Sequence, residues 1–196
     1  INNEIKPSFG LVNVGPDEDG FLRRYPIFLP ISGDSTLYYT LAIESVLAFR
    51  DYIGEKNFKI DSKKQLASIG DFLKIETYGN SNMFQINYSG PVSSTFKIFP
   101  RHPLSNILDT EDYSIGEEDG DWMDIFIGPL ALMYESMGFK NPFKDKIVVI
   151  GSSLSEDQDI HPTPYLNYDD KDSYQMSGVE IHANVMQQIL DENFIS

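Results

Sequence analysis

Two pairs of an acidic residue and a histidine stand in the last quarter of the chain, each pair with one residue between its members. The pairs are Asp159 with His161 and Glu180 with His182. Carboxylate and imidazole groups are ligands of zinc and manganese, so the pairs could hold a metal if the loop folded over the helix. Glu180 is better explained as a helix-capping residue. Without Glu180, a hypothetical metal-dependent hydrolase would use the other three side chains as metal ligands, namely Asp159, His161 and His182. In the alternative interpretation, His182 is a structural residue beside the apolar face of its helix.

A second set of small and polar residues surrounds the end of an apolar run at residues 147–151. In an open α/β sheet, ligands collect at the carboxyl ends of the strands, and a helix N-terminus favours an anion or a polar acceptor. We therefore predict a binding site for a small ligand there. Its predicted residues are Gly151, Ser152, Ser153, Asp159, Thr163 and Gly178. The alternative is structural, with Gly151 and the serines closing the strand while Asp159 and Thr163 hold the loop through bonds to the backbone.

Two familiar catalytic or binding patterns do not fit these residues. The Gly151 segment lacks the second glycine and the lysine of a phosphate-binding loop. The chain also has no Gly-x-Ser-x-Gly sequence, in which a nucleophilic serine would sit on a sharp turn. We therefore predict neither a nucleotide-binding loop nor a serine hydrolase.

The elements that would position these residues form a strand, a loop and a helix. The apolar run 147–151 predicts a strand that is buried on both faces, as in a parallel sheet. Ser177 and Glu180 stand three residues apart, which is the spacing of a capping box, and they predict a helix from Val179 to about Asp191. This pattern predicts an α/β fold with a central, mainly parallel sheet and flanking helices.

Two β-hairpins and two further helices are also predicted. The first hairpin joins residues 9–14 and 21–28 around an Asp-Gly turn, and the second joins 73–78 and 83–88. Asp17 and Asp19 in the first turn could instead bind calcium, but they lack the rest of the calcium-loop pattern. The predicted helices run from Ser35 or Thr36 to about Tyr52, and from Ile125 to Met137 with a kink or a first turn at Pro129. The polar stretch 54–70 is predicted to lie on the surface.

Length and composition restrict the class of protein. With 196 residues and 41% hydrophobic residues, the chain is long enough for one core, and we predict a single domain over residues 1–196. The net charge of −15 repels nucleic acid, which we exclude as a partner. There is no cysteine, and no apolar run approaches the length of about 20 residues that crosses a bilayer.

Several of these motifs, in the same order, resemble the second type of CHASE domain, the extracytoplasmic sensory module of bacterial cyclases and histidine kinases. The resemblance lies in residues 10–24, 86–91, 147–152, 159–164 and 178–184. It implies that conserved turn and helix residues have structural roles here, and these residues are Asp17, Asp19, Gly20, Arg23, Ser177, Glu180, His182 and Asn184. The family has further strands and helices upstream, so we expect an incomplete domain in which part of the sheet is missing.

The same resemblance implies a function. The chain would be an extracytoplasmic domain that binds an unknown small-molecule signal, without a cofactor and without catalysis of its own. The helix from Val179 would carry the signal onward, and segments outside this chain would connect the domain to the membrane. A third possibility is a dimerisation module without a ligand. If upstream strands are missing, an open sheet edge could pair two copies into a homodimer.

Overall fold

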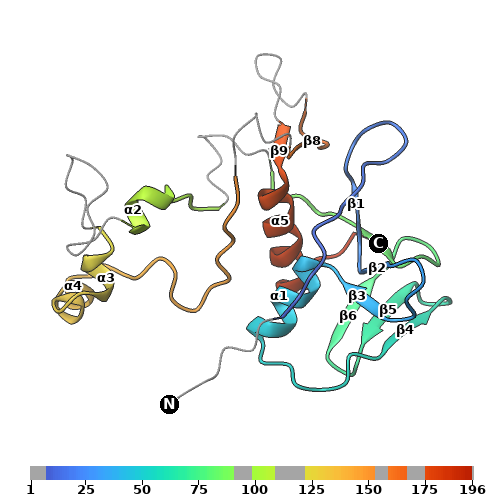
Figure 1. Cartoon of the computed structure of the whole chain (residues 1–196), viewed down its shortest axis with the longest axis horizontal. Helices are drawn as coiled ribbons and strands as arrows, with labels where there is room; N and C mark the ends of the chain where they lie inside the picture. Colours follow the sequence, from blue (N-terminus) through green and yellow to red (C-terminus); the bar gives the residue numbers. More distant parts are fainter. Residues whose placement is uncertain (1–7, 91–98, 109–121, 153–158, 167–174, 196) are drawn as a thin grey trace. The chain divides into compact units, whose positions relative to one another are not determined.

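The computed structural model of the protein describes residues 8–90, 99–108, 122–152, 159–166 and 175–195 (Figure 1). The chain divides into two compact units, which we describe separately. The larger unit comprises residues 1–98 and 149–196, and the smaller unit comprises residues 99–148. The single domain over residues 1–196 stays a prediction.

The larger unit contains four small antiparallel sheets among its described residues. β1 (Arg24–Pro26) pairs with β7 (Met83–Gln85), and β2 (Phe28–Pro30) pairs with β3 (Leu37–Tyr39). A three-stranded meander consists of β4 (Phe58–Asp61), β5 (Leu66–Ile69) and β6 (Leu73–Glu76). Finally, β8 (Ile160–Pro162) pairs with β9 (Gln175–Ser177).

Two helices lie side by side in the larger unit, α1 (Leu41–Phe49) and α5 (Gly178–Leu190) (Figure 1). The core of this unit consists of buried apolar side chains from these helices and from β1, β5, β6 and β7. The fully enclosed members of this core include Tyr25, Ile43, Val46, Ile69, Ile75, Phe84, Val185 and Ile189. The core therefore joins segments from both ends of the sequence.

The predicted central, mainly parallel sheet is wrong. Within the described residues every paired strand is antiparallel, and the one parallel contact is an isolated bridge between Leu11 and Thr40. The apolar run that was expected to be its buried strand has no strand structure, and Val148 and Ile150 are 48% and 76% exposed. An apolar run becomes a buried strand only if neighbouring strands pair with it, and the described residues supply none.

The two predicted hairpins are wrong in their pairing. The Asp-Gly turn forms, with Gly20 at φ +85° and its N–H donating to the Asp17 carbonyl at 2.9 Å. However, β1 after this turn pairs with β7 and not with residues 9–14. In the second case β6 pairs with β5. Tyr78, two residues after β6, donates its N–H to the Met83 carbonyl of β7 at 2.7 Å. Sequence alternation indicated strands but did not identify their partners.

The predicted helices are confirmed to different degrees. The C-terminal helix is confirmed to within one residue at each end. The helix expected from Ser35 or Thr36 begins only at Leu41, because Leu37–Tyr39 is used as β3. The polar stretch 54–70 was expected to be only surface, yet it contains β4 and β5, which alternate outward and inward side chains.

The smaller unit contains α2 (Leu104–Leu108), α3 (Asp124–Ile127) and α4 (Ala131–Ser136). The helix predicted over 125–137 is therefore broken around Pro129, and Gly138 at φ +95° follows its end.

Aromatic rings pack beside these helices. His102 stacks on Trp122 at 4.8 Å, and Trp122 meets the edges of Phe126 at 5.0 Å and Phe143 at 6.0 Å between ring centres.

Candidate functional site around the first turn of α5

The first turn of α5 brings together three residues of the predicted binding site. The Gly178 N–H donates to the Asp159 carbonyl at 3.0 Å, next to the β8–β9 pair. A side chain at Gly178 would overlap the Asp159 carboxylate oxygens, so that carboxylate lies directly against the helix start. A Cβ at Gly151 would come within 2.8 Å of Val179 Cβ. Gly151, Asp159 and Gly178 therefore converge, although residues 147–150 form no strand.

The other three predicted site residues differ in their placement. Thr163 is fully buried, its Oγ1 accepts the Tyr165 N–H at 3.4 Å, and its carbonyl accepts the Leu166 N–H at 2.9 Å. These bonds favour the structural interpretation of Thr163 as the residue that holds a turn. Ser152 is exposed, and Ser153 lies outside the described residues. Ligand binding by this set stays a prediction.

The proposed metal ligands are not assembled. The Asp159 carboxylate lies 3.1 Å from His161 Nε2, whereas His182 Nδ1 lies 2.8 Å from the Tyr25 hydroxyl in the core. In the described part of the chain, no three histidine, aspartate or glutamate side chains are grouped so that they could hold a metal ion. This geometry favours the structural interpretation of His182.

The environment of His182 disfavours its charged form. Burial is the main cause that lowers the pKa of His182 below 6.5, and His161 acts in the same direction. The Asp159 charge and a hydrogen bond with the Val12 backbone oppose this shift without reversing it. The Tyr25 oxygen accepts the Ala42 N–H at 3.3 Å, so the Tyr25 proton can be donated to the neutral imidazole.

The lowered pKa of His182 predicts a loss of stability in weak acid. In the unfolded chain the imidazole takes up a proton as the pH falls below about 6.5, whereas in the folded chain it resists until a lower pH. Unfolding therefore binds a proton in this window, and the melting temperature should fall from pH 7.5 to pH 5.5. We expect His182→Gln to weaken this pH dependence, as measured by calorimetry. His102→Gln, in the smaller unit and not among the groups that act on His182, is the control. An unchanged slope in His182→Gln would contradict the assignment.

The predicted capping box at the start of α5 is confirmed. Ser177 and Glu180 occupy the N-cap and N3 positions, and the Ser177 N–H donates to the Glu180 carboxylate at 3.4 Å. The buried Ser177 Oγ faces the N3 backbone but makes no well-formed hydrogen bond among the described residues. In this capping box the hydrogen bond to the Glu180 carboxylate is therefore better formed than the one to the Ser177 hydroxyl.

The turn at residues 17–20 is held by ion pairs with arginine. Arg23 Nη1 lies 2.9 Å from Asp19 Oδ1 and 3.4 Å from Asp17 Oδ2, and Arg24 Nε lies 2.7 Å from Asp17 Oδ1. The hydrogen bond from Arg23 is the main cause that lowers the pKa of Asp19. Both carboxylates thus face cationic side chains, which supports a turn rather than a calcium loop.

Two amide side chains on α5 form hydrogen bonds with the end of β7 and with the residues that follow it. Asn184 Oδ1 accepts the Ser89 N–H at 3.1 Å, and its Nδ2 donates to the Glu180 carbonyl at 2.9 Å. One turn later, Gln188 Oε1 accepts the Asn87 N–H and its Nε2 donates to the Gln85 carbonyl, both at 2.9 Å. Gln188 is not among the residues predicted from the sequence. The sequence feature that could have indicated its role is the pair of amide side chains, Asn184 and Gln188, at i, i+4 on the apolar face of a predicted helix.

Comparison with known proteins provides an independent result. A family model described as CHASE2 domain matches residues 3–196, nearly the whole chain. Searches of curated proteins and of solved structures found no match. None of the helices in the described ranges is long and apolar enough to span a membrane. The extent of the family match, together with the motifs placed above, shows that the chain belongs to the CHASE2 family of extracellular sensory domains of signalling receptors.

Proposed function

We propose that this chain is the extracytoplasmic signal-sensing domain of a bacterial transmembrane receptor whose output is a nucleotide cyclase or a histidine kinase. In this proposal a small ligand binds at the first turn of α5, and α5 carries the signal onward. The supporting observation is the convergence of Gly151, Asp159 and Gly178 at that turn. Three separate segments meet there, so a ligand that contacts them could change the position of the helix start.

The packing of α5 supports its proposed role in transmission. Its buried face packs on α1, and Arg50 beyond the end of α1 donates to the Leu190 carbonyl at 3.1 Å. Asn184 and Gln188 connect the same helix to residues 85–89. A shift at Gly178 would therefore act on a packed helix rather than on an isolated loop. In the receptor, segments that flank the sensory domain would connect α5 to the membrane.

A ligand screen followed by hydrogen exchange tests this proposal. Amino acids, sugars, nucleotides, osmolytes and divalent cations are screened for a rise in melting temperature, since a ligand of the folded state stabilises it. We expect a hit that Asp159→Asn weakens and that changes amide exchange in α5. Asp191→Asn, at the other end of the helix, is the matched control. A hit that is indifferent to Asp159→Asn would contradict the site, and unchanged exchange in α5 would contradict the transmission role.

The homodimer also remains a proposal. Sedimentation analysis of the purified chain over a range of concentrations would detect reversible association. A monomer at all concentrations would contradict it.

A further inference from the structure

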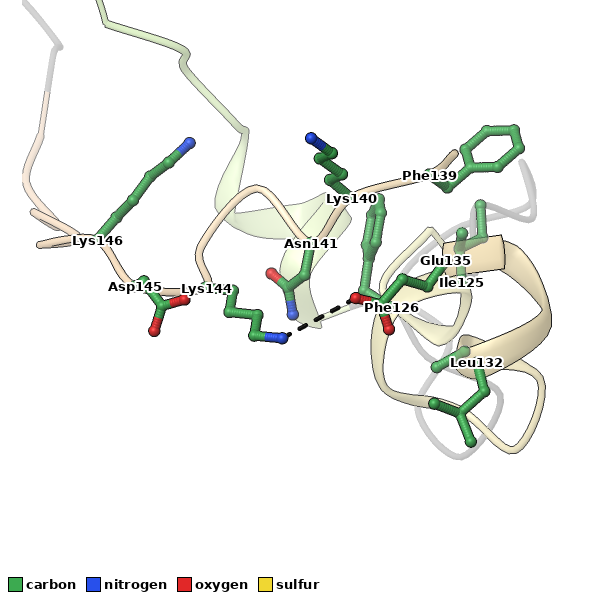
Figure 2. A pocket seen from close by; sticks show the side chains of 11 residues that line it. Ile125, Phe126, Leu132, Glu135, Phe139, Lys140, Asn141, Lys144, Asp145 and Lys146 are labelled. Atoms are coloured by element: carbon green, nitrogen blue, oxygen red, sulfur yellow. Dashed lines mark ion pairs between the residues drawn. The ribbon is translucent and has the colours of Figure 1, made fainter. Parts of the chain in front are cut away.

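The smaller unit contains a cavity of about 530 Å³ between α3, α4 and residues 139–146 (Figure 2). Small-molecule sites in proteins are concave and have volumes of roughly 300–1,000 Å³. All the lining residues belong to this unit, so the cavity is independent of the site at α5. They are Ile125, Phe126, Ala131, Leu132, Glu135, Phe139, Lys140, Asn141, Lys144, Asp145 and Lys146.

One part of the lining is apolar. It consists of side chains from α3 and α4 together with Phe139, and Leu132 and Phe139 are 81% and 49% exposed. Exposed apolar side chains are common singly, but a group that lines a hollow is typical of a binding surface. This part of the cavity would accept a hydrocarbon chain or an aromatic ring.

The other part carries an excess of positive charge. Lys144 reaches across to Glu135 at 3.9 Å, whereas Lys140 and Lys146 extend to the same side of their segment (Figure 2). Neither Lys140 nor Lys146 forms an ion pair with any residue that the structure describes, and Asp145 is the remaining carboxylate of the lining. The lining thus contains three lysines and two acids, in a chain whose net charge is −15. A local excess of cations favours an anionic group.

We propose that this cavity binds a small amphiphilic organic anion, with its apolar body against α3 and α4 and its carboxylate near Lys140 and Lys146. The apolar lining selects for a hydrocarbon body, and the two lysines, which pair with no carboxylate among the described residues, select for the sign of the head group. Lysine ammonium groups act as mobile point charges, so the head group need not have one fixed geometry. This proposal does not depend on the function proposed for the first turn of α5.

The probes for the test are octanoate, octanol and octylammonium, which share an apolar chain and differ in charge. Trp122 is the only tryptophan of the chain, and its ring lies 5.0 Å from that of Phe126 in the cavity lining. Its fluorescence therefore reports on the cavity. We expect a saturable change with octanoate and weaker binding of octanol and octylammonium.

Two variants test the two parts of the cavity separately. Replacing Lys140 and Lys146 together by glutamine should weaken octanoate binding about two- to thirtyfold, since two exposed charge contacts together contribute about 0.4–2 kcal/mol. The matched control replaces Lys63 and Lys64 in the larger unit by glutamine. Leu132→Asp should abolish binding without unfolding the chain, because Leu132 is exposed.

Three results would overturn the proposal. The first is equal affinity for the three probes, and the second is an equal loss in the control variant. The third is cosedimentation with phosphatidylglycerol vesicles without a saturable response to octanoate, which would identify the surface as a membrane-docking face instead.

Discussion

Replacing Tyr25 by alanine is expected to lower the free energy of unfolding by about 3–5 kcal/mol, the usual cost of removing a buried aromatic ring. The ring is fully buried, and its centre lies 5.8 Å from that of Phe84 and 5.7 Å from that of His182. Its hydroxyl also links α1 to α5, because it accepts the Ala42 N–H and contacts His182 Nδ1. Urea unfolding monitored by circular dichroism measures the loss.

Tyr25→Phe separates the hydroxyl from the ring. It keeps the packing but leaves the Ala42 N–H and His182 Nδ1 without their partner, and an orphaned buried polar group costs about 1–3 kcal/mol. Tyr38→Phe is the matched control, because the Tyr38 hydroxyl bonds Asp34 at an exposed site and its loss should change stability by less than about 0.5 kcal/mol. Equal effects of the two phenylalanine variants would contradict a structural role for the Tyr25 hydroxyl.

Features that depend on neighbours in the sequence could be predicted. The capping box needs only Ser177 and Glu180 three residues apart, and it placed α5 to within one residue. The Asp-Gly turn at residues 17–20 needs only a glycine that tolerates a positive φ. In both cases the residues that determine the local structure are close neighbours in the sequence.

Pairing between distant segments could not be predicted in the same way. Alternating side chains indicate that a segment is extended. However, β1 and β7 are about sixty residues apart, and no residue in either strand indicates which strand it pairs with. The apolar run at 147–151 shows the same limit. Its composition suits a strand buried on both faces, yet the described part of the fold leaves Ile150 mostly exposed.

The candidate site was predicted in part for a similar reason. Asp159 and Gly178 come together because β8 and β9 form a short antiparallel pair directly before α5. The partners of His182 and Gln188 are main-chain or phenolic groups more than 90 residues away, so they could not be identified from residues near either position. Polar residues on the apolar face of a predicted helix are the signal to examine in such cases.

Gln188→Leu is the second substitution with a large expected effect. Gln188 is 3% exposed, and its amide serves both the Asn87 N–H and the Gln85 carbonyl. Leucine would leave two backbone groups without their partner, at about 1–3 kcal/mol each, and added apolar burial would offset a part of this cost. We therefore expect a loss of about 2–4 kcal/mol in the free energy of unfolding.

The adjacent residue, Gln187, provides the matched control for Gln188→Leu. Gln187 has the same side chain on the same helix, but it is exposed and bonds Asp191 at 2.9 Å, so Gln187→Leu should change stability by less than about 0.5 kcal/mol. Amide exchange should also become faster at residues 85–89 in Gln188→Leu and stay unchanged in Gln187→Leu. Equal effects at the two positions would mean that helix propensity or surface hydrophobicity dominates. A selective effect at Gln188 would establish that side-chain amides, rather than a strand pair, hold residues 85–89 against α5.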